Sequence, residues 1–183
     1  MIAFERGHDG AITAGFTGPE ASLITSLAEQ IAGMLDPFAA PPEIDDPDAA
    51  ALYASVGLGG SSRLSDDPAI ARLLPNAYAD DEASADFRGL TERSLASRKV
   101  ANARVVVQSL RLSDVTAGVV MLSEEEAQSW LRTLADVRLT IAARLGIETD
   151  DDEGADDDSS LALRDVYDWL AWVTESLIDA IES

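Results

Sequence analysis

Apolar side chains recur every three or four residues along the last part of the chain, between residues 160 and 182. This spacing gathers them on one face of an α-helix, and such a face needs burial against other elements. The pattern therefore predicts a long C-terminal helix that contributes to a core. Its apolar face consists of Leu163, Val166, Leu170, Val173, Leu177 and Ile181; Trp169 borders this face and Trp172 points away from it.

Two capping boxes predict where other long helices begin. Thr17 with Glu20 frames the first start, and Ser123 with Glu126 frames the second. In this motif the hydroxyl and the carboxylate satisfy backbone N–H groups that have no partner within the first turn. The first helix is expected to end at the prolines at positions 37, 41 and 42, and the second at Leu145 before Gly146.

The stretch "LLPNAYADDEASADFR", residues 73–88, predicts a joint between two helices. Pro75 ends a short helix that begins at Asp67-Pro68, and a similar Asp-Pro pair at 46–47 predicts another short helix. Asp80 or Asp81 then caps a third long helix over about 81–112. A helix of this length spans roughly 48 Å, so it is expected to form a central spine, to bend near Gly89 or to break.

The first 16 residues differ from the rest, because two short apolar runs flank a turn-forming Gly7-His8-Asp9-Gly10. Asp-Gly between such runs is typical of a β-hairpin. Residues 113–122 are expected to form a loop, with or without a short strand, and acidic residues 148–158 a flexible loop. The predicted fold is mainly α, a multi-helix single domain over 1–183 with a small N-terminal β-hairpin. The aromatic residues expected in or beside its core are Tyr78, Phe87, Trp130 and Trp169.

The chain is strongly acidic, with 13 basic and 34 acidic residues and a formal net charge of −21. Such a surface repels phosphates, which argues against nucleic-acid binding, and it attracts basic partners. No apolar run approaches the roughly 18 residues that a membrane span needs, and the N-terminus lacks the order of a secretory signal. We therefore expect a cytoplasmic protein without a membrane segment.

Residue types that carry chemistry are scarce in this chain. It has no cysteine and one histidine, His8, which falls in the expected hairpin turn. Without thiolate or further imidazole ligands, a transition-metal site would need carboxylates, and no serine sits in a nucleophile elbow. The sequence therefore predicts a non-enzymatic protein with no catalytic residue, metal or cofactor.

Arg138 is a charged residue on the apolar stripe of the expected 123–146 helix, while Asp136 points to the opposite side. A partner for Arg138 is therefore expected from another helix, with Asp80, Asp81, Asp86, Asp165 and Asp168 as candidates. The alternatives are a structural ion pair, an arginine that contacts a ligand, and a side chain that extends to solvent. The candidate residues for ion pairs or partner contacts are Asp81, Arg88, Asp136, Arg138, Asp168 and Trp172.

The expected 81–112 helix also carries a basic row. Arg93, Arg104 and Arg111 share one side of it, and Arg98 and Lys99 lie elsewhere. Such a row either contacts an acidic partner or nucleic acid, or it is a solvated face that pairs with local acids.

Three sequence blocks resemble one known family, and the N-terminal "FERGHDGAITAGF" extends the resemblance over most of the chain. The blocks are "DPAIARLLPNAYADDEASADFRGLTERSLASRKVANA", "WLRTLADVRLTIAARLG" and "VYDWLAWVTESLIDAI". The family is the actinobacterial oxidative stress regulator family AosR, formerly a domain of unknown function. The matching residues are Pro75, Tyr78, Asp81, Phe87 and Arg88, then Trp130, Leu131, Asp136, Arg138 and Leu139, then Tyr167, Asp168, Trp169 and Leu170.

The resemblance implies a cytoplasmic regulator that acts through protein contacts, with the transcription machinery as the expected partner and no catalytic residues. The family's genes lie near a Clp protease adaptor gene, which implies an alternative role as an accessory factor in regulated proteolysis, with the protease adaptor as partner. A small-molecule-binding protein that uses Arg138 is a further alternative, and self-association into a homo-oligomer stays open. The resemblance links redox sensing in the family to a cysteine pair. This chain departs from the family there, since it has no cysteine, so a thiol switch cannot operate within it.

Overall fold

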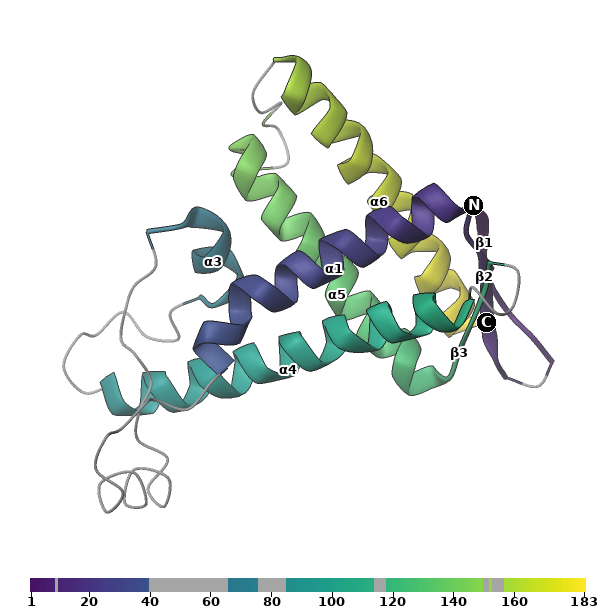
Figure 1. Ribbon diagram of the computed structural model, residues 1–183, viewed down its shortest axis with the longest axis horizontal. Coiled ribbons are helices and arrows are strands. Elements are labelled where there is room, and N and C mark those ends of the chain that lie inside the picture. The colour runs from purple at the N-terminus through teal and green to yellow at the C-terminus, as the bar shows by residue number, and fades with distance from the viewer. Residues whose placement is uncertain (9, 40–65, 76–84, 114–117, 150–151, 153–156) are drawn as a thin grey trace.

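The computed structural model describes the chain except residues 9, 40–65, 76–84, 114–117, 150–151 and 153–156, and it describes residues 85–90 and 158 by their backbone alone. Within this part the chain is mainly helical with a small antiparallel sheet (Figure 1). The strands are β1 (Ile2–Arg6), β2 (Ile12–Gly15) and β3 (Val119–Leu122); the helices are α1 (Gly18–Ala39), α3 (Pro68–Leu73), α4 (Ala85–Ser113), α5 (Glu124–Leu145) and α6 (Asp158–Glu182).

The sheet confirms the predicted N-terminal hairpin and adds a third strand to it. Its order is β1-β2-β3, and both pairings are antiparallel. The third strand comes from the 113–122 segment, where the sequence left a short strand open. Burial alternates along β3, since Val120 and Leu122 are buried and Val119 and Met121 are exposed. One face of the strand therefore packs on the core while the other faces solvent.

The helices pack as two antiparallel pairs. Figure 1 shows α1 and α4 side by side, with α5 and α6 forming the second pair across them, and helix contacts are most extensive between α1 and α4. The predicted long helix runs unbroken through Gly89, and its 29 residues make it the longest helix of the described chain. It therefore forms a spine, as one of the three predicted alternatives had it.

The capping box at Ser123 is confirmed in full, and the expected contact of Glu20 with the backbone of Thr17 is confirmed as well. Ser123 accepts from the backbone N–H of Glu126, and Glu126 accepts from the N–H of Ser123. Glu20 likewise accepts from the N–H of Thr17 at 2.8 Å, and Gly146 ends α5 in the left-handed conformation. The C-terminal helix begins at Asp158, two residues before the predicted position, because Asp157 caps it.

The end of α1 also differs from its prediction. Helix α1 continues past Pro37 to Ala39 instead of ending at the proline. A proline in the last turn removes one backbone hydrogen bond, which the end of a helix tolerates better than its middle. The helix expected at 46–47, the prolines at 41 and 42, and the aromatic residue Tyr78 lie outside the described residues, as does the side chain of Phe87.

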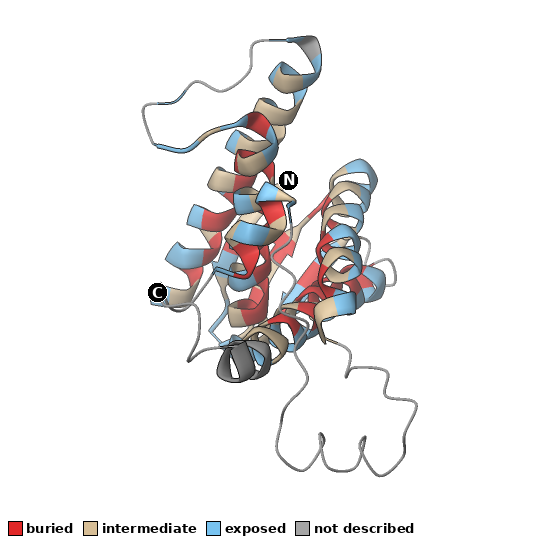
Figure 2. Cartoon of the chain, turned by 90° about the vertical axis from the view of Figure 1, so that its left-hand side faces the viewer, coloured by how far each residue is buried: buried red, intermediate tan, exposed pale blue. Residues whose placement is uncertain are grey.

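An aromatic cluster joins the sheet to the helices. Trp130 on α5 is fully buried, and its ring lies edge-on to Phe4 at 5.7 Å and stacked on Phe16 at 5.8 Å between centroids. Its indole N–H donates to the hydroxyl of Ser109 on α4 at 2.8 Å. Figure 2 shows the buried residues along the inward sides of the helices, and Trp130 and the partly buried Trp169 confirm two of the four aromatic predictions.

Strand β1 also closes the end of the C-terminal helix. The last turn of α6 contains no basic residue of its own. Arg6 instead donates to the carbonyl of Ala180 at 3.0 Å and to that of Ile181 at 2.9 Å. A guanidinium placed there satisfies carbonyls without helical partners and opposes the negative end of the helix dipole.

Gly118, which directly precedes β3, permits a close approach that a side chain would prevent. Its φ is +85°, and a Cβ atom there would lie 2.6 Å from the carbonyl oxygen of Phe16. We expect Gly118→Ala to lower the free energy of unfolding by about 2 kcal/mol. Gly10→Ala is the matched control, because Gly10 has a φ of +83° with open space around it. Urea denaturation should show a cost of about 1 kcal/mol for the control, and equal costs would contradict the role of the contact.

Candidate functional site

Two of the residues singled out in the sequence lie beyond what the structure describes. Asp81 belongs to the undescribed segment 76–84, and Arg88 lies where only the backbone is described. Their expected roles as ion-pair or contact residues stay predictions. The other four candidates, Asp136, Arg138, Asp168 and Trp172, lie on α5 and α6.

Asp136 forms an ion pair with Lys99 on α4. Its side chain is 5% exposed and that of Lys99 is 17% exposed. Burial raises the pKa of the Asp136 carboxyl above its ordinary value, and the hydrogen bond and charge of Lys99 oppose that rise. Lys99 is the only lysine of the chain. The pair therefore holds a cation of α4 and an anion of α5 together at a position largely shielded from solvent.

Arg138 faces α6 and contacts an aromatic ring there; of its candidate carboxylate partners, Asp80, Asp81 and the side chain of Asp86 lie outside what the structure describes. Its guanidinium carbon lies 4.7 Å from the centroid of the Tyr167 ring, which is cation–π geometry. Its Nε–H group is buried and donates no hydrogen bond to a described residue. Asp165 and Asp168, both described, make no ion pair with it. The partner does come from another helix, as the stripe position implied.

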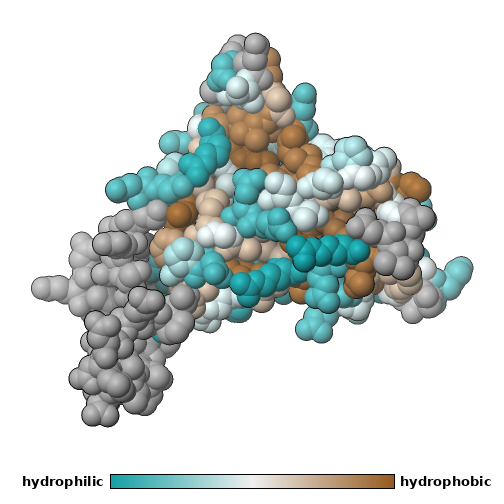
Figure 3. Space-filling view, in the orientation of Figure 1, coloured by the Kyte–Doolittle hydropathy of each residue, from teal (hydrophilic) through white to brown (hydrophobic). Residues whose placement is uncertain are grey.

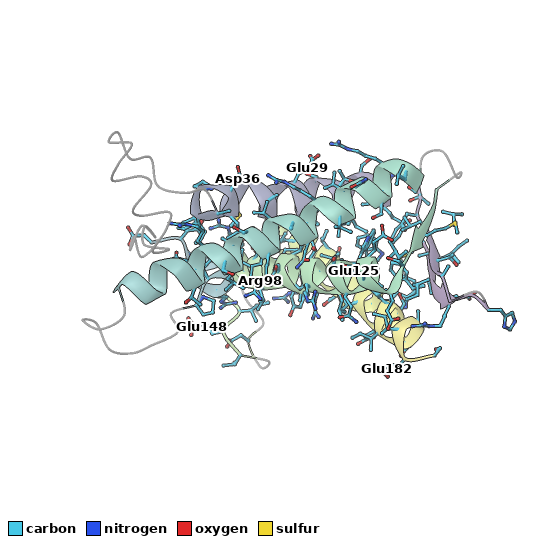
Figure 4. All side chains as sticks on the ribbon, turned by 90° about the horizontal axis from the view of Figure 1, so that it is seen from below. Glu29, Asp36, Arg98, Glu125, Glu148 and Glu182 are labelled. Carbon is cyan, nitrogen blue, oxygen red and sulfur yellow. The ribbon has the colours of Figure 1, made fainter. Side chains whose placement is uncertain are left out.

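Part of the basic row on α4 pairs with acids of α1. Arg104 donates to Asp36 at 3.1 Å, and Arg111 donates to Glu29 at 3.2 Å. Figure 3 shows strongly hydrophilic side chains where α1 and α4 lie side by side, and Figure 4 shows Glu29 and Asp36 along α1. These two arginines thus follow the interpretation of a face that pairs with local acids.

A groove lies on another side of α4, where that helix meets α5. It has a volume of about 520 Å3. Figure 4 shows Arg98 on the side of α4 away from α1. Sequence reasoning missed this groove and did not single out Arg132. The sequence signal that could have indicated a basic surface on α4 was the excess of five cations over one acid between residues 91 and 113. The polar side chains that line the groove are Arg98, Lys99, Asn102, Arg132 and Asp136.

The outer face of α6 has the opposite charge. Trp172 is 44% exposed and sits among carboxylates. At 100° per residue, the acids at i−7, i−4, i+3 and i+7 lie within about 60° of it on the helix surface. None of them makes an ion pair with a described residue. These acids are Asp165, Asp168, Glu175 and Asp179, all exposed, and we call the set with Trp172 the α6 face.

Within the described ranges no cluster of three or more His, Cys, Asp or Glu side chains has the arrangement of a metal site. No helix of the described chain is both long and apolar enough to cross a membrane.

Comparison with known proteins confirms the resemblance seen in the sequence. The chain is 26% identical over 178 residues to a proposed oxidative stress regulator AosR of Mycobacterium leprae, covering 88% of this chain and 78% of the relative. It is 27% identical over 172 residues to the oxidative stress regulators AosR of Mycobacterium tuberculosis and Mycobacterium bovis, covering 87% of this chain and 77% of each. No solved structure is significantly similar to it. The family model "Domain of unknown function (DUF2017)" matches residues 1–181, and the chain therefore belongs to the DUF2017 family.

Proposed function

We propose that the chain is a non-enzymatic regulatory protein that binds a basic segment of another protein through its α6 face. The relatives named as oxidative stress regulators support a regulatory role. The observation that carries the binding surface is Trp172, a large aromatic side chain that is 44% exposed and has four exposed acids within about 60° of it on the helix surface.

The chemistry of the α6 face selects its partner. Tryptophan is the residue most enriched among side chains that dominate binding energies, and its ring attracts the cations of arginine and lysine. Four carboxylates beside the ring strengthen this preference, and the net charge of −21 steers cationic segments toward the chain. Acidic segments and nucleic acids are repelled by the same charges. A partner segment with arginine or lysine residues around one apolar anchor fits this face.

The setting that we propose is cytoplasmic control of transcription in the stress response. The name of the relatives supports the stress response alone, and the partner that we propose is a basic segment of the transcription machinery. This chain has no cysteine, so its trigger is something other than a thiol switch within the chain. A change in the amount of partner or the binding of an effector elsewhere on the chain would serve instead.

Trp172→Ala tests the proposal. We expect the partner recovered by affinity purification and mass spectrometry with the parent chain to bind the variant at least about tenfold more weakly, because the aromatic anchor is lost. Leu139→Ala is the matched control, since Leu139 is 42% exposed on α5 and lies outside the α6 face. The readout is the Kd of the purified pair by calorimetry.

A second pair of variants examines the charge. Asp165→Asn with Asp168→Asn should weaken binding and flatten its dependence on salt, whereas Glu124→Gln with Glu125→Gln should leave both nearly unchanged, because these exposed glutamates lie on α5. Equal binding by the parent and Trp172→Ala would refute the α6 face as the binding surface. An identified partner whose binding segment is acidic would refute it as well.

A further inference from the structure

We propose that the groove between α4 and α5 binds a small ligand that carries several carboxylate or phosphate groups. This inference concerns a different surface from the α6 face and a ligand of opposite charge. It does not depend on the proposed protein partner.

The groove gathers positive charge in a chain that is otherwise acidic. Arg98, Lys99 and Arg132 line it together with one acid, Asp136, so the local balance is positive while the whole chain carries −21. Clefts of one charge sign concentrate their counter-ions, because low-dielectric walls focus the field into the opening. An oxyanion is therefore the class of ligand that this groove attracts.

The two arginines of the groove are not neutralised by a carboxylate of the described residues. Arg104, Arg111 and Arg144 each form an ion pair with a carboxylate of another element. Arg98 and Arg132, by contrast, make no ion pair with a described residue, although both are exposed. They come from the two helices that border the groove, so two guanidinium forks are available to one ligand. Such forks bind carboxylate and phosphate oxygens with paired hydrogen bonds.

The remaining lining supplies rigidity and shape. The pair between Lys99 and Asp136 links α4 to α5 across the groove. Asn102 offers an amide donor, and Leu95, Ala101 and Ala135 provide apolar surface for the body of a ligand. The volume of about 520 Å3 lies within the range typical of small-molecule sites, which favours a small ligand over a long acidic segment of a protein.

Calorimetry on the full chain at low ionic strength tests the proposal with pyrophosphate, citrate and a hexaglutamate peptide. We expect pyrophosphate or citrate to bind, and sodium chloride at the same ionic strength to give no comparable signal. The double variant Arg98→Ala with Arg132→Ala should weaken binding at least about tenfold. The double variant Arg104→Ala with Arg111→Ala is the matched control, because it removes the same charge from α4 on the side that faces α1.

Chemical labelling gives a second readout on the same chain. The amine of Lys99 is the only lysine amine. The Met1 amine, which pairs with Glu20 and is not among the groove's lining residues, is the internal reference. A bound ligand should slow acylation of Lys99 relative to Met1, as measured by mass spectrometry. No binding above the salt control, equal losses in both double variants, or binding of hexaglutamate alone would each overturn the proposal.

Discussion

Trp130→Ala is expected to lower the free energy of unfolding by about 4 kcal/mol, as the loss of a fully buried tryptophan does in other cores. The side chain is 0% exposed and contacts both Phe4 and Phe16, so its removal opens a cavity where α5 meets the sheet. Phe4 on β1, Phe16 directly after β2 and Ser109 on α4 all contact this ring, so its removal withdraws contacts from all three. Urea denaturation followed by circular dichroism measures the change.

Two further variants separate the size of the ring from its hydrogen bond. Ser109→Ala leaves the buried indole N–H of Trp130 without its acceptor, which should cost about 1–2 kcal/mol. Trp172→Ala removes the same side chain from an exposed position on α6 and should change stability by less than about 0.5 kcal/mol. If the two tryptophan variants lost equal stability, the aromatic cluster would not be the centre of the core.

The helix boundaries were predictable because their signals are local. A hydroxyl and a carboxylate three residues apart satisfy N–H groups of the same turn, so Ser123 and Glu126 mark the start of α5 wherever the rest of the chain lies. Gly146 is similar, since a left-handed residue ends a helix through its own backbone. The hairpin also follows from neighbours in sequence. What these signals specify is the list of elements, and most of that list was correct.

The groove and the partner of Arg138 depend on which helices become neighbours, and no local signal specifies that. The helical stripe placed Arg138 toward another helix. It could not say whether Tyr167 or the adjacent Asp168 would face it, because these two side chains point 100° apart and the choice depends on how α6 is turned against α5. Arg98 and Arg132 are 34 residues apart in the chain and border one groove only because α4 packs beside α5. Asp136 was selected from the sequence, yet its partner, Lys99, was not.

Lys99→Met is expected to lower the free energy of unfolding by about 3–5 kcal/mol at neutral pH, because it leaves the carboxylate of Asp136 buried without its cation. Replacing both residues, Lys99→Met with Asp136→Leu, should restore stability to within about 1 kcal/mol of the parent, since neither charge then needs desolvation. Arg104→Met is the control, because its pair with Asp36 is exposed and should contribute less than about 0.5 kcal/mol.

The pH dependence of the stability of Lys99→Met tests the cause of the loss more directly than the size of the loss does. Burial already raises the pKa of Asp136 in the native chain, and the loss of Lys99 removes the interaction that opposes this rise. A native pKa above the unfolded one means that the native state binds the proton more tightly, so the destabilisation is full above the native pKa and fades as pH falls through it. Urea denaturation of Lys99→Met and of the parent between pH 7 and pH 4 should therefore give curves that converge on acidification. Curves that stay parallel would show that the loss arises from packing of the lysine stem, and the buried carboxylate would then not be its cause.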